Sequence, residues 1–186
     1  MKKLTKSIIA SILCAVIAIT AIATVNTTTA YAESDKTPLK VTIKGKTVTL
    51  VKDINTMQGY PKVKTLKKKW GKPDTSGQNP EMPYYLWTKG KTRIDFSIFP
   101  YIDNPTARHP YIQITSSDKK FKVNGIKLIG MKQKKAKKIL KNLSMEINNF
   151  DTSDEARFEV GDITCHYEKG KVSQVTVTIL YLWEPA

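Results

Sequence analysis

Hydrophobic positions are distributed very unevenly along the chain, and the densest run lies near its start. Residues 8–25 form an apolar run that follows a lysine-rich start and precedes a polar stretch ending in Ala30-Tyr31-Ala32. This order of basic, apolar and small-x-small segments is typical of a secretory signal peptide, with cleavage expected after Ala32. The alternative is an uncleaved anchor, because the 18-residue run approaches the roughly 20 residues that span a bilayer. The pattern favours a signal peptide over residues 1–32.

The rest of the chain alternates between strand-like and helix-like patterns after a flexible segment predicted over residues 33–38. Alternating apolar and polar positions predict strands, while apolar residues three or four apart predict helices. Gly and Pro mark the expected ends of the elements. The predicted elements are a strand or hairpin over 41–50, a helix over 61–70, a loop over 75–83, a hairpin of 84–88 with 92–99, a loop over 100–110, a strand over 111–115, a helix over about 132–143 and a strand over about 173–183.

The same order of elements occurs twice, which predicts an internal duplication. Residues 41–48 align with residues 121–128 at an offset of 80, and the same offset places the Lys-Gly-Lys sequence at 89–91 on that at 169–171. We therefore predict a first α+β repeat over 39–118 and a second over 119–186. The expected fold class is α+β, with two related strand–helix–hairpin halves and helices packed on one face of a mainly antiparallel sheet.

Two short windows carry a resemblance to a known fold. Residues 66–74 end a helix with Gly71-Lys72-Pro73-Asp74, and Gly130-Met131 opens a second helix whose apolar face holds Ala136, Ile139 and Leu140. These windows resemble the tandem fold of the β-lactamase-inhibitor proteins and, in single copy, the outer-membrane assembly lipoprotein BamE. The second half has Asn142-Leu143-Ser144 where the family has Gly-x-Pro, and the inhibitors' paired cysteines are absent. The resemblance implies a fold, and no binding residue or inhibitory activity is taken from it.

The charge of the chain is strongly positive. It has 31 Lys and Arg against 16 Asp and Glu, a net charge of +15. Loss of the three lysines in residues 1–32 leaves 28 basic residues and +12. Only three of these are arginines, so the charge predicts diffuse attraction to anionic polymers rather than sequence-specific contact with nucleic acid. The alternative is that the charge only keeps the protein soluble. The candidate polyanion contacts are the helix lysines Lys67, Lys68, Lys69, Lys134, Lys135, Lys137, Lys138 and Lys141.

The sequence contains no recognisable catalytic, cofactor or metal motif. His109 and His166 are the only histidines, and no spacing typical of metal ligands or of a nucleophile elbow is present. Cys165 is the only cysteine after residue 32, so it is either a small buried side chain or a reactive thiol. An acid pair assembled by folding, for example from Asp95 and Glu155 or Glu168, is the alternative that would make the protein a hydrolase. We predict a non-enzyme without cofactors.

Aromatic residues between the two proline-containing loops form the second candidate binding surface. Tyr and Trp are favoured anchors at protein interfaces, but the same residues also build cores. Alternation puts Tyr85 and Trp87 on one face of a strand and Tyr84 on the other, so one of these faces must be buried. The candidate residues are Tyr84, Tyr85, Trp87, Tyr101, His109 and Tyr111.

Taken together, these features predict a secreted binding protein that acts without catalysis. Its expected partner is an extracellular protein or an anionic cell-wall polymer, and no membrane span is expected after cleavage. The predicted location is extracellular, with retention on the cell wall as an open alternative. The runner-up is a secreted hydrolase or wall-modifying enzyme. The sequence predicts no particular oligomeric state.

Overall fold

The computed structural model describes residues 38–54, 59–79, 82–100, 108–143, 146–158 and 161–180. All of them belong to the compact unit that begins at Lys36. The predicted signal peptide lies outside the described residues, so cleavage after Ala32 stays a prediction. Neither of the two described helices is long and apolar enough to cross a membrane.

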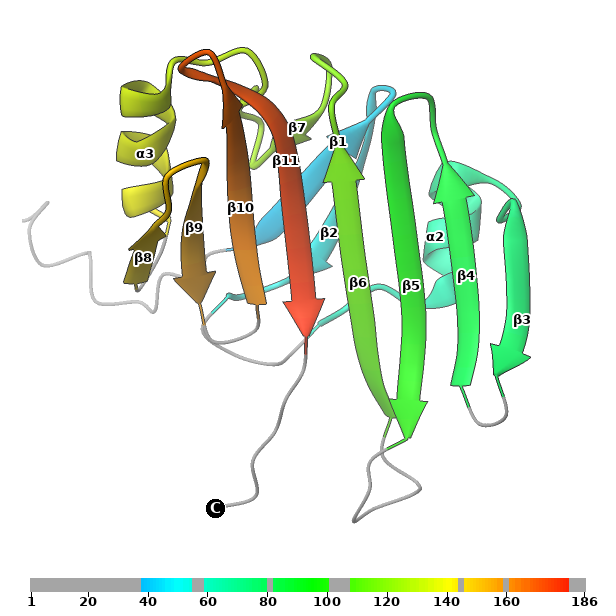
Figure 1. Cartoon of the computed structure of the whole chain (residues 1–186). Helices are drawn as coiled ribbons and strands as arrows, with labels where there is room; N and C mark the ends of the chain where they lie inside the picture. The colour runs from blue at the N-terminus through cyan, green and yellow to red at the C-terminus, as the bar shows by residue number, and fades with distance from the viewer. Residues whose placement is uncertain are drawn as a thin grey trace, which may run out of the picture. The chain divides into compact units, whose positions relative to one another are not determined.

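Eight antiparallel strands form the larger sheet, in the order β3-β4-β5-β6-β11-β10-β9-β8 (Figure 1). The chain builds β3 to β6 as one meander and β8 to β11 as another, and the two meet where β6 pairs with β11. The strands are β3 (Thr75–Asn79), β4 (Met82–Thr88), β5 (Thr92–Pro100), β6 (Arg108–Ser116), β8 (Glu146–Asn149), β9 (Ser153–Phe158), β10 (Gly161–Glu168) and β11 (Lys171–Leu180).

A smaller sheet has the order β2-β1-β7, with β1 (Leu39–Ile43) between β2 (Lys46–Val51) and β7 (Lys122–Val123). Lys44 and Gly45 connect β1 to β2 with φ values of 47° and 77°. Positive φ at both central positions is typical of the tight hairpin turn that matches strand twist, and glycine adopts it without strain. The predicted strand or hairpin over 41–50 is thus confirmed as a hairpin.

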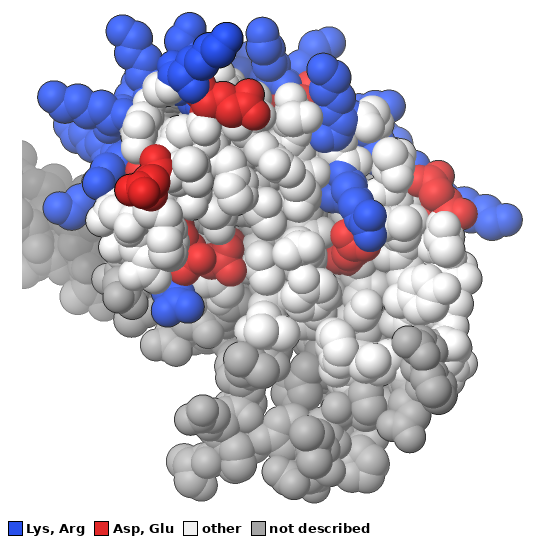
Figure 2. Space-filling model, in the orientation of Figure 1, with Lys and Arg blue, Asp and Glu red and all other residues white. Residues whose placement is uncertain are grey.

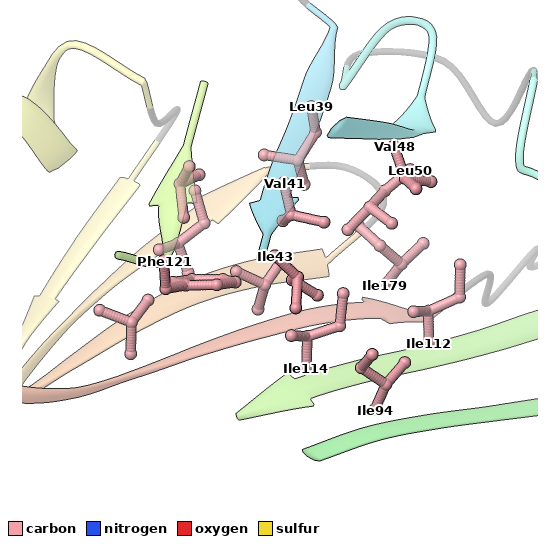
Figure 3. Packing of buried hydrophobic residues seen from close by; sticks show 14 of the residues in the cluster. Leu39, Val41, Ile43, Val48, Leu50, Ile94, Ile112, Ile114, Phe121 and Ile179 are labelled. Atoms are coloured by element: carbon pink, nitrogen blue, oxygen red, sulfur yellow. The ribbon is translucent and has the colours of Figure 1, made fainter. Parts of the chain in front are cut away.

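The hydrophobic core lies between the two sheets. Alternate residues of β1 and β2, such as Val41 and Leu50, point toward the larger sheet and meet residues such as Ile112 and Ile179 (Figure 3). All four are almost completely buried. Period-two burial on both sheets places one face of each sheet in this core and leaves the opposite face toward solvent.

Two short helices complete the fold: one contacts β2 of the smaller sheet, and the other contacts β8 to β11 of the larger sheet. In α2 (Val63–Trp70), Leu66 and Trp70 are buried, and the helix ends at Gly71, whose φ is 85° and whose N–H donates to the carbonyl of Lys67. That end is the one predicted from the sequence. In α3 (Gln133–Lys141), the buried residues are Ala136 and Leu140. Helices that bury two side chains each cannot cover an eight-stranded sheet.

The predicted α+β class, with helices packed on one face of the sheet, is therefore wrong. The described residues form a mainly β fold of two antiparallel sheets, and the three-stranded sheet occupies the place expected for the helices. The predicted loop over 75–83 is also wrong in part, because β3 occupies residues 75–79 and pairs with β4. The hairpin of β4 with β5 and the strand β6 are confirmed. In the described chain the first half consists of a hairpin, a helix and four strands. The second half has a short bridged turn in place of the hairpin, again followed by a helix and four strands. The duplication itself stays a prediction.

Candidate functional site

The candidate site is the face of the larger sheet that points away from the core, which we call the outer face. Its residues alternate with buried ones such as Ile94, Ile114 and Val177. Figure 2 views this face and shows it largely uncharged, with lysines along its upper edge. Its described members on the central strands are Tyr84, Leu86, Thr88, Arg93, Asp95, Ser97, Phe99, Tyr111, Gln113, Thr115, Gln174, Thr176, Thr178, Leu180, Asp162, Thr164, His166, Glu155 and Arg157.

Aromatic rings gather at one end of the outer face, which we call the aromatic corner: Tyr84, Phe99 and Tyr111. Tyr84 and Tyr111 lie in the same cross-strand row, separated by Ser97. The Phe99 and Tyr111 rings meet edge to face with centroids 6.1 Å apart, an arrangement that stabilises aromatic pairs. Tyr84 is 37% exposed.

A row of threonines crosses the middle of the outer face. Strand register places Thr88, Thr115, Thr176 and Thr164 in this row, with Arg93 between the first two. The hydroxyl oxygens of Thr115 and Thr176 lie 3.5 Å apart. A hydroxyl both donates and accepts hydrogen bonds, so the row offers a partner both functions without a net charge.

The charged groups of the outer face are paired with each other. Arg93 contacts Asp95 through Nε at 2.9 Å and Nη2 at 3.1 Å, which raises the pKa of Arg93. Arg157 Nε lies 2.8 Å from Glu155. Solvent-exposed pairs of this kind add little stability. Their consequence is that the outer face is nearly neutral and carries no lysine, although the chain has a net charge of +15.

Asp162 is the exception, because it is partly buried without an arginine bonded to it. Burial raises its pKa, hydrogen bonds from Thr164 and Thr178 lower it, and the nearby charge of Glu155 raises it again. Burial is also the main cause of the raised pKa of Tyr111, to which the charges of Asp95 and Asp162 add. Asp162 and Tyr111 are therefore both partly shielded from water in the unliganded structure.

Of the six predicted aromatic site residues, the structure puts two on the outer face. They are Tyr84 and Tyr111. Trp87 is completely buried and donates from Nε1 to the Gly71 carbonyl at 2.9 Å, so it cannot contact a partner.

Tyr85 also points inward, so neither Tyr85 nor Trp87, which share one face of β4, remains a candidate contact residue. Its ring stacks on Trp87 at 6.1 Å, and Lys67 Nζ lies 5.0 Å from its centre. Tyr101 and the side chain of His109 lie outside the described residues. Sequence reasoning missed Phe99. On β5, Phe99 lies two residues from Ser97, the register partner of Tyr111, so alternation along β5 places Phe99 beside the Tyr111 ring.

The eight predicted polyanion-contact lysines are all exposed, but they form two separate groups. Helix α2 lies behind the β4 end of the larger sheet, whereas α3 lies at the β8 end (Figure 1). A different group of lysines is brought together by the fold. Each of three hairpin turns contains Lys-Gly-Lys, at 44–46, 89–91 and 169–171, and all three lie along the same edge (Figure 1). We call this the lysine edge.

The carboxylates predicted as an acid pair do not meet. Asp95 on β5 and Glu155 on β9 are four strand positions apart, about 19 Å at the usual strand spacing. Glycoside hydrolysis needs two carboxyl groups about 5–10 Å apart. Glu168 lies at the β10–β11 turn. No group of three metal-ligating side chains occurs among the described residues.

Cys165 is buried in the core, as the first of the two sequence interpretations has it. Burial, with a smaller contribution from the charge of Asp154, raises its pKa to about 12. A thiol in this setting is protonated at neutral pH and is a poor nucleophile. The described structure therefore gives Cys165 a packing role.

Comparison of the chain with protein-family models, curated proteins and solved structures found no match. The resemblance to the tandem inhibitor fold therefore stays a prediction, and the functional argument rests on the site alone.

Proposed function

We propose that this chain is a secreted, non-catalytic binding protein that engages a protein partner through the outer face. The observation that carries the proposal is the composition of that face. It joins an aromatic corner, in which Tyr84 is exposed and Phe99 and Tyr111 are half-buried, to a row of threonines, and its arginines are paired with its own carboxylates. Protein interfaces combine these features, with aromatic anchors surrounded by hydrogen-bonding groups.

An anionic polymer is a poorer match to this face. Polyanions are attracted by unpaired basic groups, and the lysines lie at the edge instead. The lysine edge suits a second role, because positive charge beside a neutral interface accelerates encounter with an acidic partner. The hydrolase alternative has less support, since the carboxylates named for it are far apart.

A photo-crosslinking experiment tests the proposal in the cells that produce the protein. A photoreactive amino acid replaces Gln113, which faces outward two residues from Tyr111. We expect a protein adduct to form from this position even when the cells are irradiated in about 0.5 M salt, where the Debye length falls to roughly 4 Å. The same replacement at Lys134, exposed on α3, should give no such adduct.

Truncation of the aromatic corner provides the matched test. The double variant Tyr84→Ala, Tyr111→Ala should lose the adduct, because a central aromatic anchor contributes about 2 kcal/mol or more to binding, roughly thirtyfold in affinity. Phe150→Ala removes a more exposed ring in the β8–β9 turn and should leave the adduct unchanged. Three results would contradict a protein partner on the outer face. They are an adduct with polysaccharide, an adduct that does not form when irradiation is done in salt, and equal adduct formation from Lys134.

A further inference from the structure

The smaller sheet carries a hollow on the face that points away from the core. Its volume is about 560 Å³, and its lining comes from the β1–β2 hairpin and from residues 120–127. Small-molecule sites have volumes of about 300–1,000 Å³. The lining residues are Thr42, Gly45, Thr47, Lys120, Lys122, Gly125 and Lys127.

Strand register aligns three of these side chains across the sheet. Thr42 on β1 pairs with Thr47 on β2 on one side and with Lys122 on β7 on the other. Their neighbours Val41 and Val123 are buried, so this row points away from the core. The floor of the hollow thus consists of two hydroxyl groups and one ammonium group on a three-stranded sheet.

The two hydroxyl groups leave a donor for a ligand. The Oγ1 atoms of Thr42 and Thr47 lie 2.9 Å apart, and one donates to the other. Two hydroxyls carry two hydrogens, and this bond uses only one of them. The remaining O–H can donate to an oxygen atom bound in the hollow, alongside the ammonium group of Lys122.

The lining of the hollow carries positive charge and no negative charge. Lys120, Lys122 and Lys127 supply three ammonium groups, and no carboxylate contributes to the lining. Neither ion pair of the outer face, Arg93 with Asp95 or Arg157 with Glu155, involves these lysines. Three ammonium groups around one hollow repel one another, and a bound anion relieves that repulsion.

The backbone around the hollow is held in place. Gly45 and Gly125 each form the second position of a turn with positive φ, and no atom lies within 4 Å of a Cβ built at either residue. The turn at 124–125 is fixed to β1, because Asn124 Oδ1 accepts from the Lys40 N–H and the Asn124 N–H donates to the Lys40 carbonyl. The hollow therefore exists before any ligand binds, with a rim free of side chains at both glycines.

We propose that this hollow binds the phosphate group of a phosphate ester. Phosphate offers several acceptor oxygens and up to two negative charges, which matches three lysines and one free hydroxyl donor. The volume exceeds the needs of the bare ion, so it also accommodates a small polyol or sugar attached to the phosphate. The site lies on a different sheet from the outer face, so it does not depend on the proposed protein partner.

A polymer with repeated phosphates can extend from the hollow toward the lysine edge. Gly45 of the hollow belongs to one of the Lys-Gly-Lys turns, and Lys44 in that turn lies beside Gly90 in the next, with Cε 3.6 Å from a Cβ built there. If the natural ligand is a phosphodiester polymer, an oligomer of it should therefore bind more tightly than a single phosphate ester. If the natural ligand is a small phosphate ester, the oligomer and the single ester should bind equally.

Backbone amide NMR on the full mature chain tests the site. Glycerol 3-phosphate and a glycerol-phosphate oligomer are titrated at constant ionic strength, with sodium chloride and sodium acetate as comparison salts. We expect saturable shifts of the amides of Gly45, Thr47 and Gly125 with both phosphates. Tighter binding of the oligomer identifies a polymer as the source of the phosphate, and equal binding identifies a small ester.

Charge-matched variants make the test specific. Lys122→Gln with Lys127→Gln should weaken binding by about tenfold or more, because each removes a charge-assisted contact. Lys137→Gln with Lys138→Gln on α3 removes the same charge away from the hollow and should change affinity less than about twofold. Thr47→Val should weaken binding without changing net charge. Equal losses in both lysine variants, or shifts that never saturate, overturn the proposal.

Discussion

The ring of Tyr84 lies directly over Gly77 on the neighbouring edge strand. Gly77 and Tyr84 are paired in the β3–β4 register, and a Cβ built on Gly77 would lie 2.7 Å from Tyr84 Oη and 2.8 Å from the ring. Real contacts are never that short, so only glycine lets the ring occupy this position. An edge glycine covered by an aromatic ring from the next strand is a known way of stabilising a sheet edge.

Gly77→Ala should therefore move the Tyr84 ring without unfolding the sheet. The added methyl group meets the far end of a flexible side chain, so the ring can rotate away at small cost in stability. We expect changed Tyr84 ring proton shifts and a weaker adduct from position 113. Ser76→Ala, on the opposite face of the same strand, is the control. Unchanged Tyr84 shifts in Gly77→Ala would contradict the proposed contact.

The two inner tryptophans differ in how their indole N–H groups are satisfied. Trp87 Nε1 donates to the Gly71 carbonyl, whereas Trp70 Nε1 is buried and has no hydrogen-bond partner within the described structure. Their rings meet edge to face at 6.0 Å. Replacing either by Phe removes similar volume, but only Trp87→Phe removes a hydrogen bond, the one to the carbonyl of the exposed Gly71.

Trp87→Phe should therefore destabilise the protein more than Trp70→Phe. We expect a difference of about 1 kcal/mol in the free energy of unfolding, the usual net contribution of one intramolecular hydrogen bond. Urea unfolding followed by circular dichroism measures both variants under the same conditions. Equal destabilisation would show that the Trp87 hydrogen bond contributes nothing beyond ring packing.

Local patterns in the sequence predict the hairpins but not how the sheets are arranged. The β4–β5 hairpin, the end of α2 at Gly71 and the inward position of one β4 face follow from alternation and turn residues, which act over a few positions. The pairing of Val177 with Ile114 joins residues more than sixty positions apart, and no local pattern specifies it. The separation of residues 39–51 into a second sheet is decided in the same way, by long-range burial.

The candidate site could be predicted only in part for the same reason. Tyr84 and Tyr111 are visible as aromatic residues on strands, but strand order is needed to put them in one row with Ser97. Sequence reasoning assigned the lysines to helices, where runs are conspicuous. It did not detect that separate lysines and threonines around Gly45 and Gly125 surround one hollow.

The partly buried carboxyl group of Asp162 should make stability depend on pH. Burial is the main cause of its raised pKa. A group whose folded pKa lies above the unfolded value of 3.8 contributes stability that is present below pH 3.8 and is lost as pH rises through the folded pKa. Asp162→Asn removes this loss. We expect the unfolding free energy of the variant minus that of the parent to be larger at pH 7 than at pH 3. Urea unfolding of both proteins at both pH values measures this difference. A difference that does not change with pH would contradict the assigned pKa shift.

The buried thiol of Cys165 should be unreactive in the folded protein. Its raised pKa of about 12 keeps it protonated at pH 8, and the surrounding core excludes the reagent. We expect an aromatic disulfide reagent, which forms a mixed disulfide with a thiolate and releases an aryl thiolate, to label the native chain only at the rate of unfolding, and to label it within seconds in concentrated urea. Rapid labelling of the native chain would instead identify a reactive thiol.

The same thiol should contribute to loss of stability at high pH. Its pKa is 9.0 in the unfolded reference and about 12 when folded, so the unfolded chain loses its proton first. Stability is therefore fully present below pH 9 and falls as pH rises toward 12. Tyr167, whose pKa is raised from 10.0 by burial and by donating a 2.7 Å hydrogen bond to Asp154, adds to the fall from pH 10 upward. Cys165→Ala should reduce, but not abolish, the fall in unfolding free energy between pH 9 and pH 11. An unchanged slope would mean that Cys165 does not titrate on unfolding.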